Sequence, residues 1–150
     1  MDRKKWILII LAVILILIGS FAIYESNFSQ KVKVGESYFT IPSEFQKENV
    51  STDLVRFISN DKIFFINSNV NATNIDSAVS NYINYKNQTE NMTIEVNKLN
   101  VDGIEIHKSI VQDNSSVVHY WFNKNNHNYE IYTPTADPTM DKLIIEIIKS

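Results

Sequence analysis

The sequence predicts an α+β fold, with a mainly antiparallel sheet flanked by two amphipathic helices behind one N-terminal transmembrane helix. Three observations support this prediction. An uncharged apolar run extends from Trp6 to Tyr24. Short apolar segments separated by turn signals follow, and apolar residues recur with helical spacing in two places, near Ile75 and near Ile144. The resulting order of four strands, helix, four strands and helix is typical of α+β domains.

The N-terminal apolar run has the length of a membrane-spanning helix. Its nineteen residues, Trp6 to Tyr24, would extend roughly 28 Å as a helix, which matches the hydrocarbon core of a bilayer. Aromatic rings at both ends suit the membrane interface. The basic residues Arg3, Lys4 and Lys5 precede the run and predict a cytoplasmic N-terminus by the positive-inside rule.

A cleaved signal peptide is the alternative interpretation of this run. Ser20 and Ala22 are small and have the spacing of a cleavage site. The run is longer than the apolar region of a usual signal peptide, which favours an uncleaved signal anchor. A lipoprotein is excluded because the chain has no cysteine.

This interpretation divides the chain into four parts. We expect a cytoplasmic basic tail at residues 1–5, a transmembrane signal anchor at 6–24, a tether at 25–30 and an extracytoplasmic α+β domain at 31–150. The predicted location is the cell membrane, as a single-pass protein with its C-terminal domain outside the cytoplasm.

The exported part is acidic. Arg3, Lys4 and Lys5 account for three of the 14 basic residues, and Asp2 for one of the 17 acidic residues. The chain from Glu25 onward therefore has 11 basic and 16 acidic side chains, a net charge of −5. Without a basic patch the domain has no electrostatic means of binding nucleic acid. Without cysteine it must be stabilised by its core alone.

Strands are predicted in the first half by alternating or continuous apolar residues. Asn60-Asp61 suits a two-residue hairpin turn, and Pro42 ends its strand because it cannot donate to a ladder. The expected strands are Lys31–Val34, Tyr38–Pro42, Leu54–Ser59 and Lys62–Ser68.

A helix follows, because the apolar period changes. One helical face is formed by Ile75, Ala78, Val79, Tyr82 and Ile83. Either Thr73 or Asn74 is suited to cap its N-terminus.

Four more strands and a second helix complete the domain. Asp102-Gly103 is a strong hairpin signal, and Asp137-Pro138 combines an N-cap with proline at the first helical position. The expected strands are Met92–Leu99, Ile104–Gln112, Ser116–Phe122 and Tyr129–Thr133. The last helix presents Met140, Leu143, Ile144, Ile147 and Ile148 on one face.

The segment Phe39-Thr-Ile-Pro42 followed by Ser43-Glu44-Phe45 resembles the F-x-I-P-x-x-F opening of many PsbP-like domains. The resemblance extends over roughly Val32 to Lys149. It implies an antiparallel sheet between helices and a role as an extrinsic binding or assembly factor. It implies no catalytic residue, because that family has no shared catalytic motif.

One group of polar residues could support chemistry. Alternation places Glu105, His107 and Ser109 on one face of a strand. A hairpin closing over Asp113–Ser115 would place His119 opposite Ser109, so that His107 and His119 become diagonal neighbours able to share a metal ion or a substrate. The alternative is the polar face of an ordinary amphipathic strand. We predict no catalytic residue and no metal site.

Asparagine is abundant, with six residues in Asn-x-Ser/Thr sequons that an exported surface would expose to glycosylation. The alternative is a generally Asn-rich composition. The six are Asn27, Asn49, Asn71, Asn87, Asn91 and Asn114.

The sequence predicts a membrane-anchored, extracytoplasmic binding or assembly domain of the cell envelope, without enzymatic activity or cofactor. Its expected partners are the membrane, through the N-terminal helix, and an envelope protein, but no nucleic acid. One alternative is a surface metal-dependent hydrolase that uses His107 and His119. Another is a purely structural envelope glycoprotein.

Overall fold

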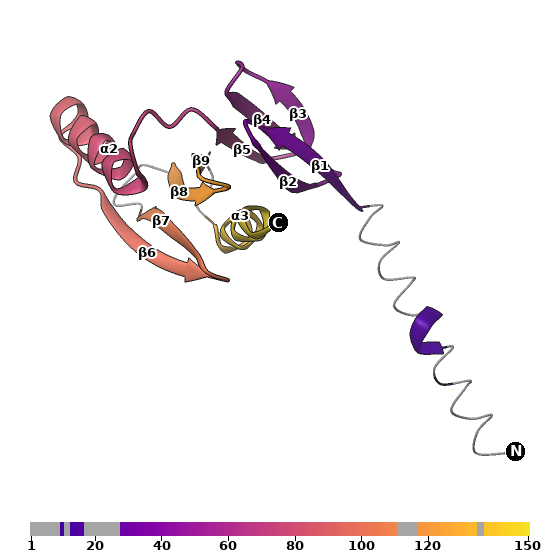
Figure 1. Cartoon of the computed structure of the whole chain (residues 1–150). Coiled ribbons are helices and arrows are strands. Elements are labelled where there is room, and N and C mark those ends of the chain that lie inside the picture. Colours follow the sequence, from indigo (N-terminus) through magenta and orange to yellow (C-terminus); the bar gives the residue numbers. More distant parts are fainter. Residues whose placement is uncertain (1–9, 11–12, 17–27, 111–116, 135–136) are drawn as a thin grey trace, which may run out of the picture.

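The computed structural model describes residue 10 and residues 13–16, 28–110, 117–134 and 137–150. Residues 13–16 are helical, and nine strands and two longer helices follow one another in the remaining described residues (Figure 1). They are β1 (Ser29–Val34), β2 (Ser37–Pro42), β3 (Gln46–Asn49), β4 (Leu54–Ser59), β5 (Lys62–Asn67), α2 (Ile75–Glu90), β6 (Glu95–Val101), β7 (Ile104–Ile110), β8 (Val118–Lys124), β9 (His127–Thr133) and α3 (Pro138–Lys149).

Seven strands form one antiparallel sheet in the order β3-β4-β5-β9-β8-β7-β6. Its tight turns use residues that tolerate a left-handed backbone. Asp102 and Gly103 have φ angles of 52° and 85° between β6 and β7, and Asn125 and Asn126 have 52° and 63° between β8 and β9. Asn60 plays the same role between β4 and β5, with φ 50°.

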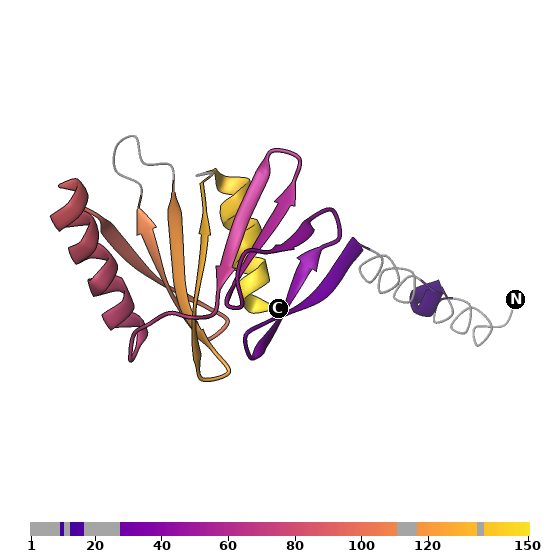
Figure 2. The same cartoon turned by 90° about the horizontal axis from the view of Figure 1, so that it is seen from above.

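The β1–β2 hairpin is a second, two-stranded sheet that packs with α3 over one face of the large sheet. Figure 1 shows the strands arranged around α3, with α2 on the opposite face. Seen from above in Figure 2, α2 and the β1–β2 hairpin lie toward opposite ends of the domain. The main core joins the hairpin, the sheet and α3; its largest fully buried side chains are Tyr120, Tyr129, Phe39, Phe45, Phe57, Phe64 and Phe122.

The turn of the β1–β2 hairpin is fastened to the large sheet by Tyr129. Its hydroxyl donates a hydrogen bond to the Val34 carbonyl and accepts one from the Glu36 N–H, each at 3.2 Å. Gly35 has φ 58°, and a Cβ there would lie 2.7 Å from Ser68 Cβ. This close approach requires glycine at the turn.

The other face of the large sheet is covered by α2 only in part, over β8. A smaller cluster beneath this helix joins Ala78 and Val79 to Trp121 of β8. Asn74 caps the helix by accepting a hydrogen bond from the Ser77 N–H at 2.8 Å, which satisfies one of the free donors of the first turn. Of the two candidate caps, Thr73 and Asn74, the structure uses Asn74.

The C-terminal helix is fixed at both ends. The Asp137 carboxylate accepts hydrogen bonds from the Thr139 and Met140 N–H groups at 2.8 and 3.0 Å. At the other end, the Thr40 N–H of β2 donates to Ser150 Oγ at 2.8 Å. Met140, Ile144, Ile147 and Ile148 are buried, as the spacing predicts.

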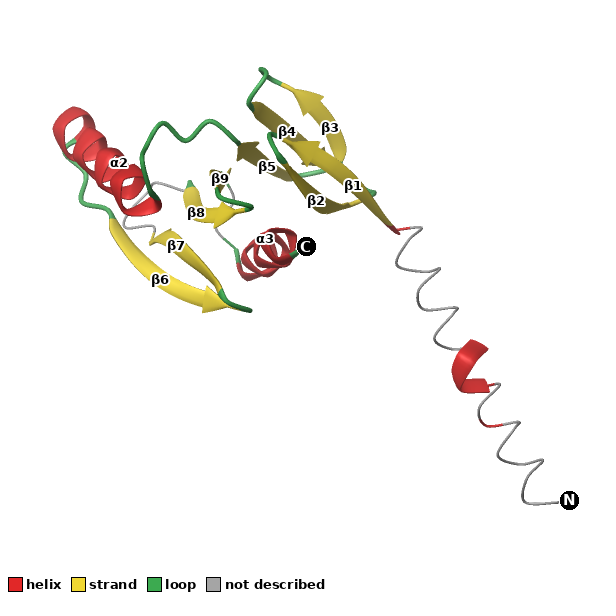
Figure 3. Ribbon diagram, in the orientation of Figure 1, coloured by secondary structure: helices red, strands yellow, loops and turns green. Residues whose placement is uncertain are grey.

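The predicted fold class is wrong in its architecture. Helices and antiparallel strands occur, as Figure 3 shows, but the chain is mostly β and forms two sheets instead of one sheet between two helices. One face of the large sheet is covered jointly by α3 and the β1–β2 hairpin. Strand β3 was not expected, because all four of its residues are polar and exposed; pairing with β4 alone defines it.

The predicted transmembrane helix is not supported either. Most of Trp6 to Tyr24 lies outside the described residues, which include only Ile10 and residues 13–16 of that range. Within the part of the chain that the structure describes, no helix is long and apolar enough to cross a membrane. The predicted basic tail at residues 1–5 also lies outside the described residues.

Two substitutions in α3 test whether this helix supports the core. Ile144→Ala should lower the free energy of unfolding by about 2–5 kcal/mol, because it leaves a cavity against the sheet. Asp137→Ala should cost about 1 kcal/mol through loss of the cap. Urea unfolding of the full-length chain measures both, with Thr139→Ala as an exposed control in the same turn. Equal, negligible effects of Ile144→Ala and Asp137→Ala would contradict the packing of α3.

Candidate functional site

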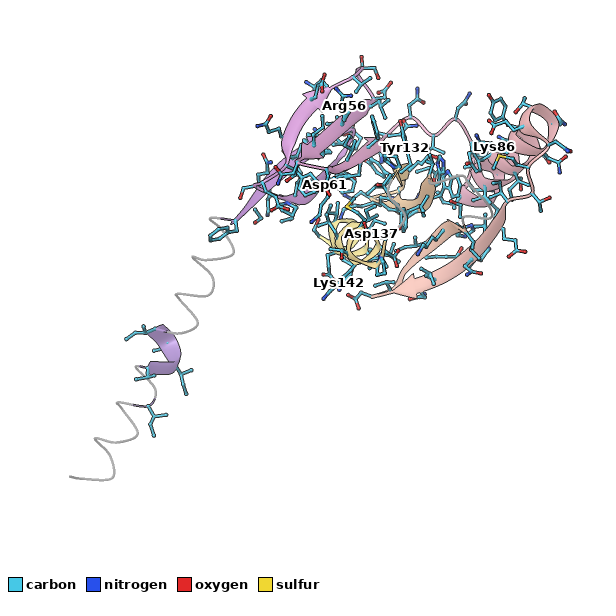
Figure 4. The ribbon with its side chains drawn as sticks, turned by 180° about the vertical axis from the view of Figure 1, so that it is seen from behind. Arg56, Asp61, Lys86, Tyr132, Asp137 and Lys142 are labelled. Carbon is cyan, nitrogen blue, oxygen red and sulfur yellow. The ribbon has the colours of Figure 1, made fainter. Side chains whose placement is uncertain are left out.

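The outer face of the large sheet, opposite the main core, carries the candidate site. Helix α2 packs on this face against β8, and β4, β5 and β9 extend beyond it. Strand register aligns one residue from each of five strands in a single row, since directly opposed residues share a face. The row is Glu48, Arg56, Phe65, Tyr132 and His119; Figure 4 labels Arg56 and Tyr132 in it.

The rings of this row stack across the strands. The Phe65 and Tyr132 centroids are 4.7 Å apart with an interplanar angle of 8°. The Tyr132 and His119 centroids are 5.4 Å apart at 26°, and His119 lies 5.3 Å from Trp121 at 10°. We call Phe65, Tyr132, His119 and Trp121 the ring stack. Each ring restrains its neighbours, so the surface is rigid before anything binds to it.

His119 is held in the stack by three contacts. Its Nδ1 lies 2.6 Å from Glu130 Oε1, and its backbone N–H donates to Ser109 Oγ at 2.8 Å. Tyr82 of α2 closes over the imidazole at 4.4 Å between centroids. The side chains of His119 and Glu130 are only 13% and 15% exposed, so that the hydrogen bond between them is shielded from water.

The tyrosines around Glu130 resist ionisation. Burial, followed by the charges of Glu130 and Glu90, raises the pKa of Tyr82 to about 12. Burial and the same glutamate raise the pKa of Tyr132. Both phenols therefore stay neutral at physiological pH and can act as hydrogen-bond donors rather than bases.

His107 belongs to a separate charged cluster at the start of α2. Its Nε2 lies 2.7 Å from Glu105 Oε1, and Lys98 Nζ donates to Asp76 Oδ1 at 3.0 Å. The pKa of Asp76 is lowered by its hydrogen bond to Lys98 and by the positive charge of that lysine. The pKa of Glu105 is lowered mainly by its hydrogen bond with His107, and next by the charge of Lys98. The cluster links α2 to β6 and β7.

The structure places the candidate residues on one face but does not join them in one site. Glu105, His107, Ser109 and His119 do share the outer face, and Ser109 does contact His119. Each imidazole is paired with a different glutamate, His107 with Glu105 and His119 with Glu130. Among the described residues, no group of three or more His, Cys, Asp or Glu side chains could hold a metal ion. The predicted turn at Asp113–Ser115 lies outside those residues.

Sequence reasoning did not find Glu130, Phe65, Tyr132 or Tyr82 as neighbours of His119. The strands containing the first three were expected, but their order in the sheet was not. Alternation alone could have placed Glu130 and Tyr132 on one face of their strand. Nothing in the sequence indicates that this strand pairs with both β5 and β8.

Four of the six sequon asparagines are described, and all four are exposed. Asn49 ends β3, Asn71 precedes α2, Asn87 lies near the end of α2, and Asn91 caps its C-terminus with φ 53°. Asn27 and Asn114 lie outside the described residues. Exposure is what glycosylation requires; use of these sites stays a prediction.

Two hollows lie on the other face of the sheet. One, of about 430 Å³, lies between the β1–β2 hairpin and the C-terminal end of α3. The second, of about 510 Å³, lies between the start of α3 and strands β6, β7 and β8. Neither is lined by His107, His119 or Glu130.

No family model matches the chain, and no curated protein matches it. The PsbP-like resemblance therefore stays a prediction.

The charged cluster predicts a pH dependence of stability. Because the pKa values of Asp76 and Glu105 are lowered in the folded state, both carboxylates stabilise the fold fully when the pH is above their ordinary pKa values of 3.8 and 4.5. This stabilisation is lost as the pH falls through the lower pKa values that the two carboxylates have in the folded state. Between about pH 5 and pH 2.5 the wild-type chain should therefore lose more stability than Lys98→Met, in which both carboxylates have lost a stabilising charge.

Urea midpoints measured across this pH range provide the test. Lys47→Met, on the exposed strand β3, removes an equal charge elsewhere and should leave the wild-type slope unchanged. Parallel curves for the wild type and Lys98→Met would show that the cluster has no such role.

Proposed function

We propose that this protein is a non-enzymatic binding or assembly domain exposed outside the cytoplasm, at the cell envelope. The observation that carries this proposal is the ring stack at the border of α2, continued by Arg56 on the open outer face. The basic cluster and apolar run at the N-terminus support export.

The composition of the open face suits a protein partner. Ile58, Ile63, Phe65 and Tyr132 are half-buried beside Arg56. Aromatic residues and arginine are enriched in protein interfaces and dominate their binding energy. Because the rings are already stacked, a partner would lose little side-chain entropy in ordering them.

The titratable groups favour binding over catalysis. A histidine that acts as a general base needs a cavity in which a substrate can reach its second ring nitrogen, and neither hollow described above is lined by His107 or His119. His107 and His119 each have a ring nitrogen within 2.7 Å of a glutamate oxygen. Tyr82, with its pKa near 12, is a poor base.

Cross-linking at the open face tests this function. The chain has no cysteine, so Ile63→Cys provides a unique attachment point for a photo-cross-linker on the outer face. A membrane-impermeant maleimide reagent, added to intact cells, should label this variant and yield a discrete adduct with one envelope protein. Phe65→Ala combined with Tyr132→Ala in this background should reduce the adduct about tenfold, the magnitude expected for removing interface aromatics.

Lys33→Cys, on β1 and remote from the ring stack, is the matched control and should be labelled without giving that adduct. Far-UV circular dichroism and a melting curve establish that the double substitution leaves the chain folded. Absence of labelling at both cysteines would contradict exposure outside the cell. Labelling with identical adducts at both positions, unaffected by the double substitution, would contradict a role of the open face.

Zinc titration tests the hydrolase alternative. The melting temperature of the full-length chain in mild detergent should not change at micromolar Zn²⁺, because the described residues contain no group of three side chains placed to hold one ion. A rise of several degrees that disappears in both His107→Ala and His119→Ala would instead support a shared metal site.

A further inference from the structure

Strand β6 has one free edge. All seven of its residues, Glu95 to Val101, pair with β7, and it is the last strand of the large sheet. Within the described chain, β6 has no partner on its other side. Alternate backbone N–H and C=O groups along that side are therefore open to another extended chain. The strand is regular and contains no proline.

A hollow lies directly beneath this free edge. Asn97 and Leu99 of β6 form part of its wall, together with apolar residues that include Ile110, Val118 and Tyr120. The charged side chains on this wall are Lys108, Asp137 and Asp141. The volume of the hollow is about 510 Å³. The hollow lies where α3 begins at Pro138, and Asp141 in the first turn of that helix is bonded to Tyr120 and Lys108 beside it. A strand added to β6 would direct every second side chain toward it.

Charge restricts what such a strand can be. The β6–β7 hairpin and the first turn of α3, residues 95–110 and 137–141, contain five carboxylates and two lysines. The lysines are paired, Lys98 with Asp76 at 3.0 Å and Lys108 with Asp141 at 2.7 Å. A third lysine, Lys149, pairs with Asp102 at 3.2 Å, and the carboxylates still outnumber the lysines. This surplus of negative charge attracts a basic segment and repels an acidic one.

The other edges are less suited to strand addition. β3 has only four residues, all exposed. On β2, the Thr40 N–H is already bonded to Ser150 Oγ, and β1 carries Lys31 and Lys33 as exposed charges, a common protection of edges.

A second copy of the chain is a poor occupant of the β6 edge. Antiparallel self-pairing centred on this strand would place Lys98 opposite its own copy, which is unfavourable. It would also bring together two surfaces with the same surplus of negative charge.

We infer that the β6 edge binds an extended segment of another protein by strand addition, with apolar side chains entering the hollow and lysine or arginine residues facing its acidic surroundings. The inference rests on the proposed binding function. It adds a second contact surface at β6, the edge strand at the other end of the large sheet from β3. Backbone pairing provides affinity, and the hollow selects the side chains.

Defined peptides test this inference. The probe is a seven-residue peptide that alternates lysine and valine; one control replaces lysine with glutamate, and another has proline at its centre. Hydrogen–deuterium exchange of the full-length chain in mild detergent should show protection of residues 95–101 by the probe and no change at residues 46–49. Neither control should protect β6.

Asn97→Lys should weaken binding of the probe about tenfold, measured by fluorescence anisotropy, because it places a lysine at the hollow and opposes a basic strand. Gln46→Lys makes a similar change on exposed β3 and should leave the affinity unaltered. Failure of the probe to protect β6 at about millimolar concentration, or equal binding of the glutamate peptide, would overturn the inference.

A dimer in sedimentation velocity that dissociates on Asn97→Lys would also overturn it, by making a second copy the occupant. The adduct at Ile63→Cys is independent of these results. If that adduct forms while β6 stays unprotected, the binding function stands and only the β6 inference fails.

Discussion

The structure depends on covering both faces of its central strands. Along β8, Tyr120, Trp121 and Phe122 are consecutive and all buried, with exposures of 1%, 2% and 0%. Successive residues of a strand point to opposite faces, so the strand is stable only if something packs on each side. Burying one such side chain is worth roughly 1.5–3 kcal/mol. The β1–β2 hairpin and α3 supply cover for Tyr120 and Phe122, and α2 supplies it for Trp121.

This cover is uneven, and the unevenness defines the surfaces available for binding. On the outer face, α2 packs against β8, and β4, β5 and β9 lie beyond it. His119 lies at this boundary, between Tyr82 of the helix and Tyr132 of the open sheet. On the core face, α3 leaves a hollow beside β6. Both surfaces exist because α2, with sixteen residues, and α3, with twelve, are too short to cover all seven strands of the large sheet.

Charged groups in this domain mainly connect its elements. Lys98 and Asp76 join β6 to α2, Lys108 and Asp141 join β7 to α3, and Lys149 and Asp102 join α3 to the β6–β7 turn. Exposed pairs of this kind contribute little energy individually. They do fix the relative positions of helices and sheet, which matters for a surface that must be preformed to bind. Carboxylates still outnumber lysines around β6, so the net charge there stays negative and can attract a basic partner.

The features that the sequence determined by itself are those that depend on a few neighbouring residues. Asp137 caps its helix as expected, and Asn74, one of two candidates, caps the other. Asp102-Gly103 forms its turn, and Ile144 faces the core. Alternation correctly placed Glu105 and His107 on one face. Each of these outcomes is decided by interactions within about four residues, where helical and strand geometry leave few alternatives.

The tertiary structure alone decided which elements meet. Strand β3 has no apolar signal of its own and exists through pairing with β4. The β1–β2 hairpin forms a separate sheet although its alternation would equally suit the large one. Phe65 stacks on Tyr132, far away in the sequence, because β9 lies between β5 and β8. Strand order depends on how apolar faces from distant segments fit together to exclude water, and local sequence patterns contain no information about that choice.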